Sequence, residues 1–257
     1  MGIDTGNRGG GKWTMPFNPG RESRFRLVCF PHAGGSAGSF LSLAAAAPPG
    51  LEVVGVQYPG RQWRRAEPSA TDLHALARGA ADALAADPGL PTAVLGHSMG
   101  ALVAFETVRL LEAERPGSVD RLFVSGSRAP SRPREAAGKR QWTDAELIAE
   151  LRRLGGTDDR LLSDAPALAA AVAALRADYR VLADYRPAPG ARAELPVTVL
   201  MGSADPTAGP EHAADWRQFS GGAFDVRVFP GGHFFLAENA AGLIRLVLDG
   251  LVVPKLS

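Results

Sequence analysis

The sequence predicts an α/β domain with a mostly parallel central sheet flanked by helices. Short apolar runs rich in Val, Leu and Phe alternate with longer helical patterns, which is typical of parallel strands joined by helical crossovers. The chain of 257 residues is long enough for one large core, and α/β domains of this length often stay undivided. We therefore expect a single domain over residues 24–257.

The lengths of these runs separate strands from helices, because strands are short and helices extend over roughly ten residues or more. Strands are expected at residues 25–30, 52–57, 93–96, 121–125, 197–201 and 225–229. Helices are expected at about residues 71–86, 99–114, 210–219 and 239–251.

Two segments fall outside this alternation. The N-terminal stretch is rich in Gly and polar residues, so residues 1–23 are expected to be disordered, with order beginning near Arg24. About seventy residues separate the strand ending at residue 125 from the strand starting at residue 197. A gap of this length predicts an insertion over about residues 128–190.

The insertion contains two helical patterns. It opens with a Pro/Arg/Ser-rich stretch at residues 128–140 that we expect to be a mobile hinge. A capping-box pattern at residues 143–146 then begins a helix that ends at the glycines 155–156. A second pattern from residue 166 to about 184 has apolar residues three and four apart, including Leu175 and Tyr179. We interpret the insertion as a lid with Leu175 and Tyr179 facing the substrate; an ordinary helical elaboration is the alternative.

Composition excludes several classes of partner. A formal net charge of +1 provides no global field to attract nucleic acid or an anionic membrane. No segment reaches the roughly 18 uncharged apolar residues of a membrane span, and the N-terminus lacks the apolar core of a secretory signal. The single cysteine, Cys29, excludes an intramolecular disulfide, and the scattered histidines show no metal-ligand spacing. We expect a soluble cytoplasmic protein without a metal.

The pattern Gly-x-Ser-x-Gly marks a nucleophile elbow, a strained turn that exposes a serine oxygen. The chain contains it twice, at residues 34–38 around Ser36 and at residues 96–100 around Ser98. Composition alone would give roughly 0.2 matches, so context has to choose between them.

Only Ser98 has the context that an elbow requires, a strand that ends at the motif and a helix that starts after it. The apolar run at residues 92–95 leads into Gly96, and a strong helical pattern follows Met99. Ser36 instead follows its strand by a loop, where a loop or helix-capping hydroxyl is the simpler interpretation. Ser98 is therefore the predicted nucleophile.

The loop before Ser36 is a candidate for the oxyanion hole. Serine hydrolases of this fold take one oxyanion donor from the loop after an early strand and another from the residue after the nucleophile. The predicted donors are the backbone amides of Ala33 and Met99. A plain Gly-rich turn is the alternative for the loop at residues 31–35.

The acid and the base are expected on loops after the last two strands, in the chain order serine, acid, histidine. Asp205 follows the strand at 197–201, and His233 follows the strand at 225–229. The other four histidines fall in a helix, beside the nucleophile, in the oxyanion loop and in the helix after the acid loop: His74, His97, His32 and His212. His233 could instead be a structural loop histidine, and Asp205 could simply cap a turn before Pro206.

Four motifs give the chain a family resemblance: CFPHAGG at residues 29–35, YPGR at 58–61, GHSMG at 96–100 and PGGHFFL at 230–236. Together they resemble the type II thioesterases, the stand-alone editing enzymes that accompany polyketide and nonribosomal peptide synthases. The likeness runs from about Phe25 to Leu251 and departs from the family in its less charged acid loop around Asp205.

The resemblance implies an α/β-hydrolase fold with a helical lid and no cofactor. It also implies that the substrate is an acyl thioester on the phosphopantetheine arm of an acyl or peptidyl carrier protein. A lipase or carboxylesterase is the nearest alternative, because the same triad serves oxygen esters. A chain-releasing synthase domain is another, although no carrier domain precedes the first strand. A catalytically inactive fold that only binds acyl carriers is the alternative from a different class.

Overall fold

The computed structural model describes residues 11–20, 22–87, 89–131, 142–154 and 164–252. A seven-stranded sheet in the order β1-β3-β2-β4-β5-β6-β7 forms its centre. β1 (Thr14–Pro16) is antiparallel to β3 (Leu51–Val56), and every other neighbouring pair is parallel. The other strands are β2 (Phe25–Phe30), β4 (Thr92–His97), β5 (Arg121–Ser125), β6 (Val197–Gly202) and β7 (Phe224–Phe229). The predicted mostly parallel α/β sheet is confirmed.

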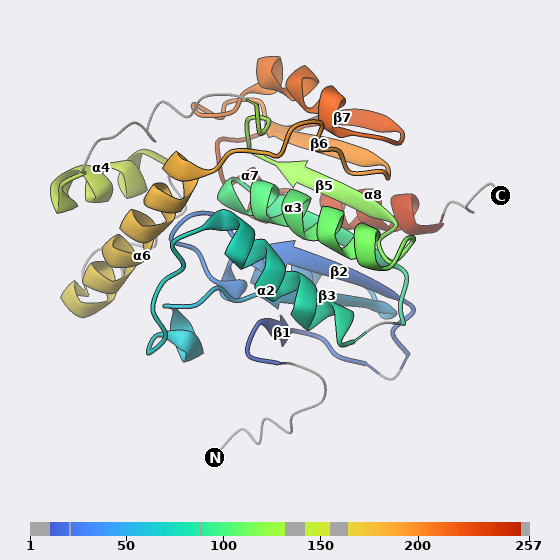
Figure 1. Ribbon diagram of the computed structural model, residues 1–257, viewed down its shortest axis with the longest axis horizontal. Helices are drawn as coiled ribbons and strands as arrows, with labels where there is room; N and C mark the ends of the chain where they lie inside the picture. Colours follow the sequence, from blue (N-terminus) through green and yellow to red (C-terminus); the bar gives the residue numbers. More distant parts are fainter. Residues whose placement is uncertain (1–10, 21, 88, 132–141, 155–163, 253–257) are drawn as a thin grey trace.

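Helices cover both faces of this sheet (Figure 1). One face carries α2 (Leu73–Ala85), α3 (Met99–Glu114) and the 3₁₀ helix η4 (Pro210–Phe219). The opposite face carries α1 (Leu41–Ala46), α7 (Phe235–Glu238) and α8 (Ala240–Val252). The short α1 and α7 were not predicted, because four to six residues carry too little periodicity to reveal a helix.

Side chains of the strands alternate between the two faces. In β2, Val28 and Phe30 join the core under α2 and α3, whereas Leu27 and Cys29 join the core under α8. Because both faces are covered, the four buried positions of this strand, residues 27–30, are all apolar, which explains the unbroken run in the sequence. Full burial of a side chain such as Phe30 contributes about 1.5–3 kcal/mol.

The N-terminal segment is ordered earlier than the sequence predicts. β1 pairs with β3, and the backbone N–H of Gln57 donates to the Trp13 carbonyl at 2.8 Å. The Arg64 guanidinium stacks on the Trp13 ring, 4.1 Å from its centre. The expectation that order begins near Arg24 is therefore wrong for this stretch, since three strand residues are too few to signal a strand. Residues 1–10 lie outside the described part of the chain.

The predicted insertion supplies α4 (Asp144–Leu154) and α6 (Ala165–Asp184). Both helices lie beyond the carboxyl ends of the parallel strands (Figure 1). The capping box is confirmed, because the Thr143 amide donates to the Glu146 carboxylate at 2.8 Å and the Glu146 amide donates back to Thr143 Oγ at 3.3 Å. Most of the expected hinge and the glycines 155–156 fall outside the described residues. No helix in the described ranges is long and apolar enough to cross a membrane.

Candidate active site

Ser98 lies at the turn between β4 and α3, as predicted. Its backbone adopts φ 57° and ψ −117°. In the part of the chain that the structure describes, Gln62 is the only other non-glycine residue with positive φ. Such a conformation costs about 1–3 kcal/mol and persists where surrounding packing enforces it. The strain is what a nucleophile elbow requires to expose the serine oxygen.

The two glycines of the elbow permit close backbone packing. A Cβ on Gly96 would lie 2.2 Å from the carbonyl oxygen of Gly100, and a Cβ on Gly100 would lie 2.1 Å from the carbonyl oxygen of Phe30. Neither position can therefore accept a side chain without moving β2 or α3. The Gly-x-Ser-x-Gly match around Ser36 lacks the strained turn of an elbow. Ser36 precedes the short 3₁₀ helix η1 (Ala37–Phe40) and has an ordinary φ of −136°.

Asp205 and His233 come together from the loops after β6 and β7. His233 Nδ1 donates to Asp205 Oδ2 at 2.8 Å, with side-chain exposures of only 3% and 0%. A carboxylate only accepts hydrogen bonds, so this contact holds the proton on Nδ1 and leaves Nε2 as the basic nitrogen.

The second oxygen of Asp205 caps the turn that follows. Asp205 Oδ1 accepts hydrogen bonds from the Thr207 amide at 2.8 Å and from Thr207 Oγ at 2.7 Å. The turn-capping interpretation therefore applies to Oδ1, whereas Oδ2 makes the contact with His233 that the acid interpretation predicts. Burial acts to raise the pKa of Asp205, but the hydrogen bond and charge of His233, with those from Thr207, outweigh it and lower the pKa.

Thr207 is a site residue that the sequence analysis did not single out. Its Oγ also lies 3.0 Å from His233 Nδ1, so it contacts both members of the pair. The signal was present in the sequence, because an aspartate side chain commonly accepts the amide two residues later, and a threonine at that position can add its hydroxyl.

The predicted oxyanion amides belong to residues that line the same cavities as Ser98. Ala33 shares one cavity with Ser98 and His233, and Met99 shares another with the same two residues. Among the described residues, neither amide donates a hydrogen bond to the protein. Met99 is the first residue of α3, where helical amides have no partner within the helix.

The insertion forms part of the wall around Ser98. The larger cavity has a volume of about 460 Å³. Helices α4 and α6, with a residue two positions before α4, contribute to its lining: Trp142, Glu150, Arg153, Leu154, Tyr179 and Leu182. Tyr179 lines both cavities, whereas Leu175 lines the smaller one and is almost fully buried against Leu147 and Val172. The two predicted lid residues therefore both line a cavity that contains Ser98, but Leu175 is buried and Tyr179 is partly exposed.

Two further histidines, His97 and His32, lie near the pair formed by Asp205 and His233. The ring of His97 lies 5.0 Å from that of His233, and its Nδ1 is 3.1 Å from Ser125 Oγ. Burial, together with the neighbouring imidazoles, lowers the pKa of His97. Burial and the charges of His233 and Arg61 lower the pKa of His32 to about 3. Both rings are therefore neutral near pH 7.

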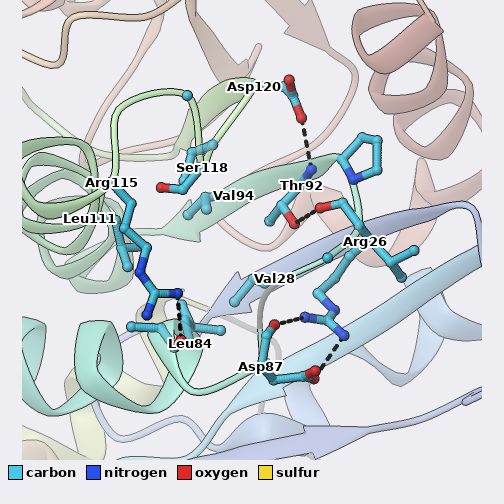
Figure 2. A pocket seen from close by; sticks show the side chains of 16 residues that line it. Arg26, Val28, Leu84, Asp87, Thr92, Val94, Leu111, Arg115, Ser118 and Asp120 are labelled. Carbon is cyan, nitrogen blue, oxygen red and sulfur yellow. Dashed lines mark hydrogen bonds and ion pairs between the residues drawn. The ribbon is translucent and has the colours of Figure 1, made fainter.

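A third cavity, of about 400 Å³, lies at the opposite end of the parallel strands, where β2 and β4 begin (Figure 2). Its charged side chains all make hydrogen bonds within the protein. Arg26 contacts both Glu52 and Asp87, Arg115 donates to the Ala85 carbonyl, and the Asp120 carboxylate accepts the Thr92 amide. Figure 2 shows Arg26 directed at Asp87 and Asp120 directed at the amide of Thr92. The candidate catalytic side chains Ser98 and His233 line the cavities at the other ends of the strands.

The parallel sheet, the helices on both of its faces and the strained serine after β4 define an α/β-hydrolase. Comparison with known proteins narrows this class. Residues 25–250 match the family described as the thioesterase domain, and the chain belongs to this family. It is therefore a thioesterase, and the fold, family and activity that the sequence motifs implied are confirmed.

Several similar proteins are named as thioesterases or for a biosynthetic pathway. The chain is 40% identical to thioesterase PikA5 of Streptomyces venezuelae, over 95% of this chain and 87% of the relative. It is 34% identical to the gramicidin S biosynthesis protein GrsT of Aneurinibacillus migulanus, over 95% and 97% of the two chains. Among solved structures, it resembles the type II thioesterase BorB of the borrelidin biosynthetic cluster with a TM-score of 0.83 and 38% identity, covering 95% of this chain and 100% of BorB.

Proposed function

We propose that this thioesterase hydrolyses acyl groups from the phosphopantetheine arm of an acyl or peptidyl carrier protein, and so removes stalled or aberrant acyl groups during polyketide or nonribosomal peptide synthesis. The likeness to solved type II thioesterases supports this substrate class, among them BorB of the borrelidin cluster and YbtT of the yersiniabactin NRPS/PKS biosynthetic pathway. The observation that carries the chemistry is the buried hydrogen bond between Asp205 and His233 beside the cavity that contains Ser98.

The proposed mechanism assigns one role to each group. His233 Nε2 takes the proton of Ser98, and the serine oxygen attacks the thioester carbonyl. The amides of Ala33 and Met99 donate to the oxyanion that forms. Asp205 orients the imidazole and stabilises its protonated form.

Collapse of the tetrahedral intermediate expels the phosphopantetheine thiolate and leaves an acyl ester on Ser98. A thiolate leaves easily, so proton donation by His233 matters less in this step than it would for an amide. The proton nevertheless passes from His233 to the departing sulfur, which restores the basic nitrogen. Water then attacks the ester with His233 again acting as base, which releases the free acid. This sequence of steps needs no cofactor. The setting we propose is the cytoplasm, where a single buried thiol, Cys29, stays reduced.

The test is hydrolysis of a panel of acyl groups loaded on carrier proteins, with release of the free acid measured by mass spectrometry. We expect turnover by the wild-type protein and none above background by Ser98→Ala. The same acyl chain offered as an oxygen ester distinguishes a lipase or carboxylesterase, which would cleave the ester at least as fast as the carrier-bound thioester.

A catalytically inactive carrier-binding protein is distinguished by covalent labelling. A fluorophosphonate should add to Ser98 of the wild-type protein, and peptide mapping should locate it there. An unlabelled protein that still binds acyl carriers would favour the inactive alternative.

A further inference from the structure

A buried ion pair connects the insertion to the loop after β2. Arg61, in the loop after β3, pairs with Asp178 of α6, and the two side chains are only 6% and 4% exposed. The other oxygen of this carboxylate, Asp178 Oδ2, accepts a hydrogen bond from the Gly34 amide at 2.7 Å. Arg61 Nη1 donates to the Gly35 carbonyl, also at 2.7 Å. The pair therefore holds two consecutive residues of the predicted oxyanion loop.

Stability alone does not account for this pair. Replacing a buried ion pair by apolar residues of similar volume is often neutral or stabilising, because desolvation offsets the attraction of the charges. Within the described residues, Arg61 Nε is moreover buried without a hydrogen-bond partner. The guanidinium therefore leaves its Nε donor without a partner, while its Nη1 donates to the Gly35 carbonyl.

The same loop is held on its other side as well. The Tyr58 hydroxyl donates to the Pro31 carbonyl at 3.3 Å. Gly34 adopts φ +77°, and a Cβ built on it would lie 3.4 Å from the Cβ of Leu175 on α6. Ala33 thus lies between two anchored points, and α6 contributes the anchor on its C-terminal side.

We propose that Arg61 and Asp178 are positioning residues that hold the Ala33 amide toward the oxyanion and make the seating of α6 a condition for fast turnover. This inference rests on the proposed function, because it takes the Ala33 amide as an oxyanion donor. Neither side chain lines the cavities that contain Ser98, so the effect acts through the loop. Tyr179 and Leu182 of the same helix do line the cavities, which links the acyl pocket to the oxyanion loop.

The decisive variant is the double exchange Arg61→Met with Asp178→Leu, which removes both charges and leaves neither unpaired. We expect a folded protein whose kcat falls about 10²-fold, because losing or misplacing one oxyanion donor has effects of this order. KM should stay within about threefold of wild type. The affinity for an acyl-chain boronic acid, which forms a tetrahedral adduct on the nucleophile, should fall in parallel with kcat/KM.

The control is the double exchange Arg26→Met with Glu52→Leu, which removes a similarly buried pair at the opposite end of the strands and leaves only the half-exposed Asp87 without its contact to Arg26. It should leave kcat and boronic acid affinity unchanged. If the Arg61 and Asp178 double variant does not fold, Asp178→Asn, which preserves shape and one acceptor oxygen, is measured by the same criteria.

A folded variant with kcat within threefold of wild type, or with a change in KM alone, would overturn the inference. Failure of the wild-type protein to hydrolyse any carrier-bound thioester would instead count against the proposed function.

Discussion

Asp205 Oδ2 accepts a hydrogen bond from His233 Nδ1 at 2.8 Å, across 28 residues of chain. Two strands of the parallel sheet lie side by side, β6 and β7, and the loops at their carboxyl ends bring the two side chains together. The same edge of the sheet presents Ser98 after β4. This arrangement, with the amides and the insertion around it, leads to four predictions.

The first prediction separates the two Gly-x-Ser-x-Gly matches. Ser98→Ala should lower kcat/KM by about 10³-fold or more, because the nucleophile is lost while binding remains. Ser36→Ala should retain most activity, since Ser36 precedes η1 in a relaxed backbone conformation. Steady-state hydrolysis of one acyl thioester by both variants is the measurement. An inactive Ser36→Ala beside an active Ser98→Ala would reverse the assignment.

The second prediction concerns Thr207, whose hydroxyl contacts both Asp205 and His233. Thr207→Val keeps the shape and the backbone amide but removes the hydroxyl. Because one such hydrogen bond contributes about 1 kcal/mol, kcat/KM should fall roughly fivefold. Thr207→Ser, which restores a hydroxyl, is the control and should recover most of the loss. Equal activity of the valine variant and wild type would show that the hydroxyl is not needed.

The third prediction tests whether the insertion acts as a lid over the acyl chain. Tyr179 is the better probe than Leu175, because Leu175 is packed inside the insertion and a charge there would disrupt it. Tyr179→Lys should penalise long acyl chains more than short ones, by about fourfold for each CH₂ that loses apolar contact at 0.8 kcal/mol.

The control for this experiment is Ala173→Lys, at an exposed position of the same helix. It should leave the chain-length profile of kcat/KM unchanged. A uniform loss across short, medium and long acyl thioesters in Tyr179→Lys would contradict the lid interpretation.

The fourth prediction concerns pH and His32. Burial, with the charges of His233 and Arg61, lowers the pKa of His32 to about 3 in the folded protein, against an ordinary value of 6.5. The unfolded chain therefore binds a proton below about pH 6.5 that the folded protein does not bind until about pH 3. Stability must fall as the pH drops through this window, by about 2 kcal/mol between pH 7 and pH 5 for this group.

Urea unfolding at pH 7 and pH 5 measures this effect. His32→Gln should lose less stability over that interval than the wild-type protein, with the remaining loss shared by groups such as His97, whose pKa is also lowered. The contribution of His32 would be disproved if both proteins lost the same free energy of unfolding.

The sequence by itself determined the local features of this protein. Alternating apolar runs established the parallel α/β sheet, and the strand, glycines and helix around Ser98 identified the elbow, because these signals depend on neighbouring residues. The chain order of Asp205 and His233 followed from the positions of the last two strands. The family motifs at residues 29–35 and 230–236 then indicated the class of thioesterase.

Tertiary structure alone decided which distant groups meet. The pairing of Arg61 with Asp178 joins residues 117 positions apart, and no local pattern around either residue indicates the other. The same holds for β1, whose three residues are a strand only because β3 offers an edge. Local propensity acts over a few residues, whereas burial and hydrogen bonding between distant segments depend on how the whole chain packs.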